Sequence, residues 1–153
     1  MFNWLRRPKP VPTDSWSIAR IEEDGRTVIL RFRRSTPPGV KTQDYPYRLN
    51  IYWRYDGEAT EGMPPGALHD RMVELEQRLD PIEGTGAGFF VLAISGNNRK
   101  EWIWYVADKS AYMIQVSQAL HGADPFPVEF ETSDDPQWSH FAASLASVGE
   151  KAH

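Results

Sequence analysis

The sequence predicts an α+β protein, a two-layer sandwich in which helices lie on one face of an antiparallel-rich sheet. Two aromatic and apolar runs between residues 88 and 106 meet at Gly96-Asn97-Asn98, a pattern typical of a β-hairpin. Asp24-Gly25 joins two alternating segments in the same way. Apolar residues then recur at helical spacing in three further segments, which indicates amphipathic helices.

The first predicted hairpin spans residues 16–34. Its Asp24-Gly25 pair suits a type I′ turn, which requires positive φ at both central positions. In the second strand the side chains alternate, so one face is predicted to be core and the other mostly solvent-exposed. The core set is Val28, Leu30 and Phe32, and the opposite set is Ile29, Arg31 and Arg33.

A strand, a helix and the central hairpin are predicted next. Residues 47–55 alternate cleanly between apolar and polar side chains, as a half-buried strand does. The hairpin of residues 88–106 is apolar at nearly every position, so we expect it at the centre of the sheet with both faces covered. Between them, a helix is predicted to begin at Gly66 and to be ended by Pro81 and Gly84. It carries one apolar stripe, formed by Leu68, Met72, Leu75, Leu79 and Ile82.

The last third of the chain predicts two helices and a short strand. Asp108 or Ser110 can cap the first helix, which ends at Gly122. Residues 126–132 alternate weakly, as a short strand does. Residues 133–136 predict another helix start, because acids and proline are favoured in the first turn. The apolar side of this last helix is Trp138, Phe141, Leu145 and Val148.

From Tyr47 onward the predicted order is strand, helix, strand, strand, helix, strand, the order of a ferredoxin-like split βαβ core. We predict this core with an added amino-terminal β-hairpin and a carboxyl-terminal helix. A simple antiparallel meander backed by the same helices is the alternative. Residues 14–150 are predicted to form a single α+β domain, and residues 1–13 a flexible tail. The tail's aromatic and basic residues also suit an anionic membrane surface, and that alternative stays open.

Composition limits the classes of function. The 153 residues include no cysteine, which excludes disulfides, thiolate metal sites and cysteine nucleophiles and suits a cytoplasmic protein. No apolar run is long enough for a transmembrane segment. The net charge of −4 divides into +6 over residues 1–54 and −10 over residues 55–153. This asymmetry suits a polar interaction surface or, equally, strands with arginine on a solvated face. The negative total makes nucleic acid an improbable partner.

Motifs for catalysis or metal binding are absent. Gly84-Thr85-Gly86-Ala87-Gly88 follows a helix and precedes a strand, the reverse of a phosphate-binding loop. His69, His121, His140 and His153 lack metal-pair spacing. Glu129, Glu131, Asp134 and Asp135 could bind a cation, but helix capping explains the last two more simply. We therefore expect no cofactor and no metal, and we lean against an enzyme.

The predicted binding residues are arginines on solvent-facing strand positions. If their strands pair, Arg31, Arg33, Arg48 and Arg54 share one sheet face with Tyr52. Arginine beside an aromatic ring suits phosphate, carboxylate or an acidic protein surface, and a merely solvated sheet face is the alternative. Substituting these arginines with alanine should leave the fold intact, since changes on such a face usually cost under about 0.5 kcal/mol.

Several of these segments together resemble a known family. They are Trp53-Arg54-Tyr55, Gly62-Met63-Pro64, Asn98 to Tyr105 with Asp108, and Asp134 to Trp138 with Phe141. In order and content they resemble the bacterial family catalogued as domain of unknown function 695. The resemblance implies no assigned activity. The resemblance also implies that, in some proteins, the domain has a neighbouring domain similar to regulator of ribonuclease activity B. That regulator is a small acidic protein that binds an RNA-degrading enzyme.

We expect a non-catalytic cytoplasmic interaction or regulatory module with a possible protein partner. The alternative is an enzyme or small-ligand-binding protein whose carboxylate and arginine site is assembled from distant residues. Loop acids are candidates for that site, because loops carry much of protein function. These acids are Asp56, Glu58, Glu61 and Asp108. The oligomeric state and the identity of any partner are not encoded in these patterns.

Overall fold

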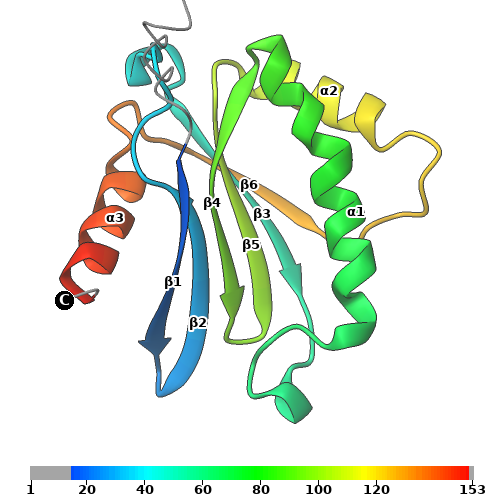
Figure 1. The fold of residues 1–153 in the computed structure, drawn as a ribbon. Helices are drawn as coiled ribbons and strands as arrows, with labels where there is room; N and C mark the ends of the chain where they lie inside the picture. The colour runs from blue at the N-terminus through cyan, green and yellow to red at the C-terminus, as the bar shows by residue number, and fades with distance from the viewer. Residues whose placement is uncertain (1–14, 152–153) are drawn as a thin grey trace, which may run out of the picture.

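The computed structural model describes residues 15–151 and consists of a six-stranded antiparallel sheet with three helices, which confirms the α+β class (Figure 1). The strands are β1 (Trp16–Glu23), β2 (Arg26–Arg33), β3 (Tyr47–Arg54), β4 (Gly88–Gly96), β5 (Arg99–Val106) and β6 (Glu129–Asp134). The helices are α1 (His69–Leu79), α2 (Lys109–Ala119) and α3 (Ser139–Lys151). The predicted tail, residues 1–13, and His153 lie outside the described residues.

Both predicted hairpins form, and their turns have the expected backbone geometry. Asp24 and Gly25 have φ values of 54° and 75°, and Asn97 and Asn98 have φ values of 52° and 69°. Two successive positive φ angles match the right-handed twist of the flanking strands, and Asn, Asp and Gly adopt them at the lowest cost. The β4–β5 hairpin occupies the two central positions of the sheet, as its apolar sequence predicts.

The strand order is β1-β2-β4-β5-β3-β6, and every neighbouring pair is antiparallel. A simple meander is therefore wrong, because β3 lies between β5 and β6 instead of beside β2. Strands β3 and β4 are both antiparallel to β5, which lies between them. The amino-terminal hairpin extends this arrangement through the pairing of β2 with β4.

A β-bulge interrupts the pairing of β4 with β5 between Phe90 and Leu92. Because a bulge places two residues of one strand opposite one residue of its partner, it changes which face the following side chains take. Phe90 and Ala93 consequently lie on one face of the sheet, whereas Val91 and Leu92 both lie on the other. This shift lets the apolar run of β4 supply large side chains to both faces.

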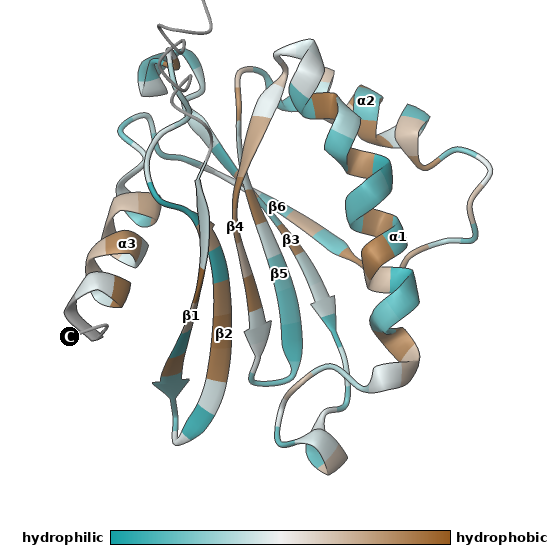
Figure 2. Cartoon of the chain, in the orientation of Figure 1, coloured by the Kyte–Doolittle hydropathy of each residue, from teal (hydrophilic) through white to brown (hydrophobic). Residues whose placement is uncertain are grey.

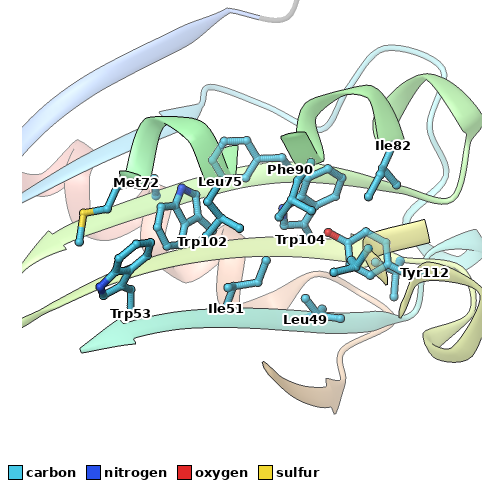
Figure 3. Close-up of a cluster of buried hydrophobic side chains, with 14 residues drawn as sticks. Leu49, Ile51, Trp53, Met72, Leu75, Ile82, Phe90, Trp102, Trp104 and Tyr112 are labelled. Carbon is cyan, nitrogen blue, oxygen red and sulfur yellow. The ribbon is translucent and has the colours of Figure 1, made fainter. Parts of the chain in front are cut away.

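Helices α1 and α2 cover one face of the sheet and bury its larger core (Figure 3). Trp102 and Trp104 project from β5 toward Met72 and Leu75 of α1, and Tyr112 approaches from α2. Trp104 lies near Tyr112 with ring centroids 5.2 Å apart. Full burial of each large apolar side chain contributes roughly 1.5–3 kcal/mol, so these aromatic residues are a main source of stability.

Helix α3 packs on the opposite face, so the prediction that all helices lie on one face is wrong (Figure 1). Trp138 and Phe141 contact Ile103 and Tyr105, which alternate along β5 with the tryptophans of the other face. Trp138 stacks on Tyr105 with centroids 4.4 Å apart. The cause lies in β4 and β5, whose apolar residues on both faces need covering. Strands β2 and β4 carry much of the apolar colour in Figure 2.

Element boundaries near the end of the chain differ from the prediction. Strand β6 covers Glu129–Asp134 instead of residues 126–132, and α3 begins at Ser139. The capping acid is nevertheless among those predicted: Asp135 accepts hydrogen bonds from the backbone N–H groups of Ser139 at 2.7 Å and His140 at 3.0 Å. Asp108 caps α2, as predicted, by accepting from the backbone N–H of Ala111.

Candidate functional site

The five predicted binding residues do not share one face of the sheet. In the register, Arg31 pairs with Ala93, which pairs with Trp102 of the α1 face. Arg48 pairs with Tyr105, and Tyr52 with Glu101, which lie on the opposite face. Arg31 and Arg33 therefore point toward α1, whereas Arg48, Tyr52 and Arg54 point to the side of α3. Alternation within β2 or within β3 cannot predict whether their arginines share a face. That depends on how the two strands between them, β4 and β5, are paired.

Arg33 is not on a solvated surface, contrary to the prediction. It is 2% exposed and donates from Nε to the backbone oxygen of Phe90 at 2.7 Å, beside the bulge. Its guanidinium also forms an ion pair with Glu83 and lies 5.0 Å from the centroid of the Trp16 ring. These contacts tie β2 to the segment after α1, so Arg33 has a structural role.

Arg31 makes a similar bridge to α1 itself. Its Nη1 donates to Glu76 Oε2 of α1 at 2.9 Å, and its Nη2 bonds the other carboxylate oxygen. The Trp102 indole donates to Glu76 Oε1 at 2.9 Å. Burial acts to raise the pKa of Glu76, but the hydrogen bonds and charge of Arg31 outweigh it and lower that pKa. Glu76 is thus a carboxylate with both oxygens engaged.

The other three predicted residues lie on an open, polar part of the sheet. Arg54 contacts Glu129 at 3.2 Å and lies 5.3 Å from the ring centroid of Tyr52. Arg48 donates to the side-chain oxygen of Asn50 at 3.1 Å. Asn50, in turn, donates to the buried Glu101 at 2.6 Å, and burial raises the pKa of that carboxyl. The surface residues here cover a hydrogen-bonded polar layer.

A groove runs beside α1 on the other face of the sheet. Its larger hollow, about 630 Å³, lies between α1, the loop before it and strands β2, β4 and β5. A second hollow of about 460 Å³ adjoins it toward the start of β1 and the end of β2. Arg31 and Glu76 line both hollows, so the two hollows meet at this ion pair. We call the two adjoining hollows the α1 groove.

The walls of the larger hollow are mostly apolar and its floor is polar. Its apolar lining is Ile29, Met63, Pro64, Pro65, Met72 and Val73. Arg31, Glu76 and Lys100 supply charge on the floor, and His69 stands at the first turn of α1. Such a mixture of apolar walls and few convergent polar groups is typical of binding sites.

Lys100 differs from the other cations of the groove. Among the residues that the structure describes, it has no ion-pair partner within 4.0 Å, and its Nζ lies 5.6 Å from the centroid of the Trp102 ring. Burial lowers the pKa of Lys100, the charge of Arg31 lowers it further, and Glu76 acts in the opposite direction. Sequence reasoning missed this residue, although its position two residues before Trp102 placed it on the same strand face as the core tryptophans.

Two of the loop acids predicted as alternative site residues have local structural roles. Asp108 caps α2, and Asp56 accepts from the backbone N–H of Glu58 within its own turn. Asp135 caps α3, while Glu129 pairs with Arg54. Within residues 15–151, no cluster of three or more His, Asp or Glu side chains is suited to a metal ion. The described helices also include none with the length and apolar character needed to cross a bilayer.

The comparison with known families identifies the chain. Residues 14–145 match the model of the family of unknown function DUF695, and the chain belongs to this family. The match covers all of the segments on which the sequence resemblance rests and confirms it. A search of curated proteins found no match.

Proposed function

We propose that this member of a family without an assigned activity is a non-catalytic protein-interaction module of the bacterial cytoplasm, which binds an extended segment of a partner protein in the α1 groove. The observation that carries the proposal is the groove itself, with its apolar walls, polar floor and open length beside α1. The cysteine-free sequence supports the cytoplasmic setting.

The apolar surface of the groove supports a protein partner. Val73 of α1 lies on its rim and is 38% exposed, and Ile18 on the edge strand β1 is 73% exposed. Ile18 pairs with Arg31 in the register, so its side chain belongs to the same face of the sheet as the groove. Exposed apolar residues beside a concave polar floor are characteristic of surfaces that bind a partner.

The shape of the groove favours an extended segment over a compact ligand. The two hollows follow one another along the line of α1, from Pro64 at one end to Trp16 and Phe90 at the other. An extended peptide places alternate side chains on opposite sides, which suits a depression with one helical and one strand wall. The proposal includes a ferredoxin-like core; the order β4-β5-β3-β6 supports it.

The predicted contact residues take different places in this proposal. Arg31 lines the groove and belongs to the docking site. Arg48, Tyr52 and Arg54 lie on the opposite face and form a second candidate contact surface, with Arg54 the most exposed of the ion-paired arginines there. Arg33 is buried and is assigned a structural role instead.

A small-ligand-binding role is the second candidate, and two observations favour it. The larger hollow falls within the range of roughly 300–1,000 Å³ of small-molecule sites. The Arg31–Glu76 pair also joins residues 45 positions apart, as the predicted arginine and carboxylate site requires. A panel of metabolites screened by thermal shift tests this role, which requires stabilisation by at least one compound that is abolished by Val73→Arg.

Selection from a phage-displayed library of random octapeptides tests the protein-interaction role. Val73→Arg places a charged side chain on the rim of the groove, and Ile114→Arg on α2 is the matched control, since Ile114 is also an exposed apolar residue of a helix. We expect enriched peptides to bind the unsubstituted protein and Ile114→Arg equally and to lose binding to Val73→Arg. Hydrogen exchange should show protection in β2 and α1. Absence of enrichment, or binding that ignores Val73→Arg, contradicts the proposal.

A further inference from the structure

The arginines that line or border the α1 groove are paired with carboxylates of the protein. Arg31 pairs with Glu76 and Arg33 with Glu83, whereas Arg71 and Arg78 on α1 both pair with Glu74. Each of these guanidinium groups has a carboxylate within reach. Lys100 also lines the larger hollow. Among the described residues, no carboxylate oxygen lies within 4.0 Å of its Nζ.

Glu76 is already engaged by other donors, which occupy three of the roughly four acceptor sites of its carboxylate. Its Oε1 receives hydrogen bonds from Arg31 and from the Trp102 indole, and its Oε2 receives a second bond from Arg31. A bidentate arginine–carboxylate pair is among the most stable arrangements of these groups. The ammonium of Lys100 therefore has hydrogen-bond donors available toward the hollow.

The surroundings of Lys100 favour the binding of an anion next to its ammonium group. It is half-buried on a central strand, between the Trp102 ring and the groove, and faces the positive guanidinium of Arg31. An ammonium removed from water and beside a like charge is unfavourable unless an opposite charge approaches. Arg31, Glu76 and Lys100 together leave the floor with one positive charge, so a single negative charge balances it.

We infer that Lys100 is the anion-binding position of the α1 groove and that it receives one carboxylate side chain, an aspartate or glutamate flanked by apolar residues, from the docked segment. This inference rests on the proposed function. The apolar neighbours of the acid would pack against Met63, Pro64 and Val73 on the walls. In the lining of the larger hollow the carboxylate is Glu76, which Arg31 and the Trp102 indole already engage, so a basic side chain finds no free carboxylate at this position.

The test uses the most enriched octapeptide from the displayed library, with binding measured by titration calorimetry on the whole chain. Lys100→Met keeps the length of the side chain and removes its charge. Lys41→Met, at an exposed position outside the groove lining, is the matched control. We expect the peptide to contain an acid, and its affinity to fall about 10- to 100-fold with Lys100→Met and not with Lys41→Met, the usual loss for a charge-assisted contact.

A second pair of measurements separates a direct contact from a structural effect. Replacing the peptide acid with its amide should lower affinity for the unsubstituted protein by the same factor and leave affinity for Lys100→Met unchanged. Lys100→Arg should retain most of the affinity. Thermal unfolding confirms that each variant is folded. A peptide that binds the groove equally well to Lys100→Met overturns the inference and leaves the proposed function in place, whereas failure of all peptides at the groove removes both.

Discussion

Two strands of this protein each carry two arginines on one face, yet the structure uses them differently. On β2, Arg31 and Arg33 point toward α1, pair with Glu76 and Glu83, and lie beneath the ring of Trp16. On β3, Arg48 and Arg54 point to the opposite face, where the Arg54–Glu129 pair is largely exposed. The contrast teaches that arginines an even number of residues apart indicate one face of a strand, while the elements packed on that face decide whether those arginines are structural.

Arg33→Ala should produce the largest effect and sharpens the comparison most. The substitution leaves Glu83 without its buried guanidinium and the Phe90 carbonyl without its donor. Removing one partner of a buried ion pair typically costs about 3–5 kcal/mol, because the remaining charge is uncompensated. Urea unfolding followed by tryptophan fluorescence measures the loss.

A double variant, Arg33→Met with Glu83→Gln, is the control for this prediction. It removes both charges while keeping side chains of similar length, and it should recover part of the lost stability. If Arg33→Ala costs less than about 1 kcal/mol, the clamp between β2 and the segment after α1 is not a structural element.

Asp135→Ala should have an intermediate effect, because this residue secures α3 on the face that carries Arg48. Its carboxylate accepts from two backbone N–H groups of α3 and from the Tyr105 hydroxyl at 2.8 Å. Loss of a capping side chain costs roughly 0.5–2 kcal/mol. Thermal unfolding at neutral pH measures the loss. Asp134→Ala is the matched control, since the side chain of Asp134 is 81% exposed, and an equal loss there would contradict this role.

The effect of Asp135→Ala should also depend on pH. Burial acts to raise the pKa of Asp135, but the hydrogen bonds from His140, Tyr105 and Ser139 and the charge of Arg48 lower it below 3.8. A carboxyl with a depressed folded-state pKa stabilises above its unfolded value and loses that contribution as pH falls through the folded value. The difference between the two proteins should therefore shrink below about pH 4. A difference that stays constant down to pH 2 would exclude an ionised capping group.

Arg54→Ala should have the smallest effect and completes the comparison. The side chains of Arg54 and Glu129 are 62% and 67% exposed, so solvent screens their ion pair. Exposed pairs contribute about 0–1 kcal/mol, and we expect a change within about 0.5 kcal/mol in urea unfolding. A loss approaching that of Arg33→Ala would mean that burial does not distinguish the two strands.

Local features of the sequence predicted much of the secondary structure. The turn residues Asp24-Gly25 and Asn97-Asn98 identified both hairpins, because few other residues adopt two successive positive φ angles. The apolar stripe of Leu75 and Leu79 identified α1, and Asp108 identified the start of α2. The helix boundary near Pro136 was less accurate, since the capping acid Asp135 lies four residues before the first helical residue.

The sequence by itself determined the α+β class, the two hairpin turns and the faces of each separate element, since these follow from spacing over a few residues. Only the tertiary structure decided that Arg33 is buried, that α3 covers the second face, and that Lys100 lies in a groove beside α1. The physical reason is distance along the chain. Arg31 and Glu76 are 45 residues apart, and whether such groups meet depends on strand register and helix packing, which no local pattern encodes.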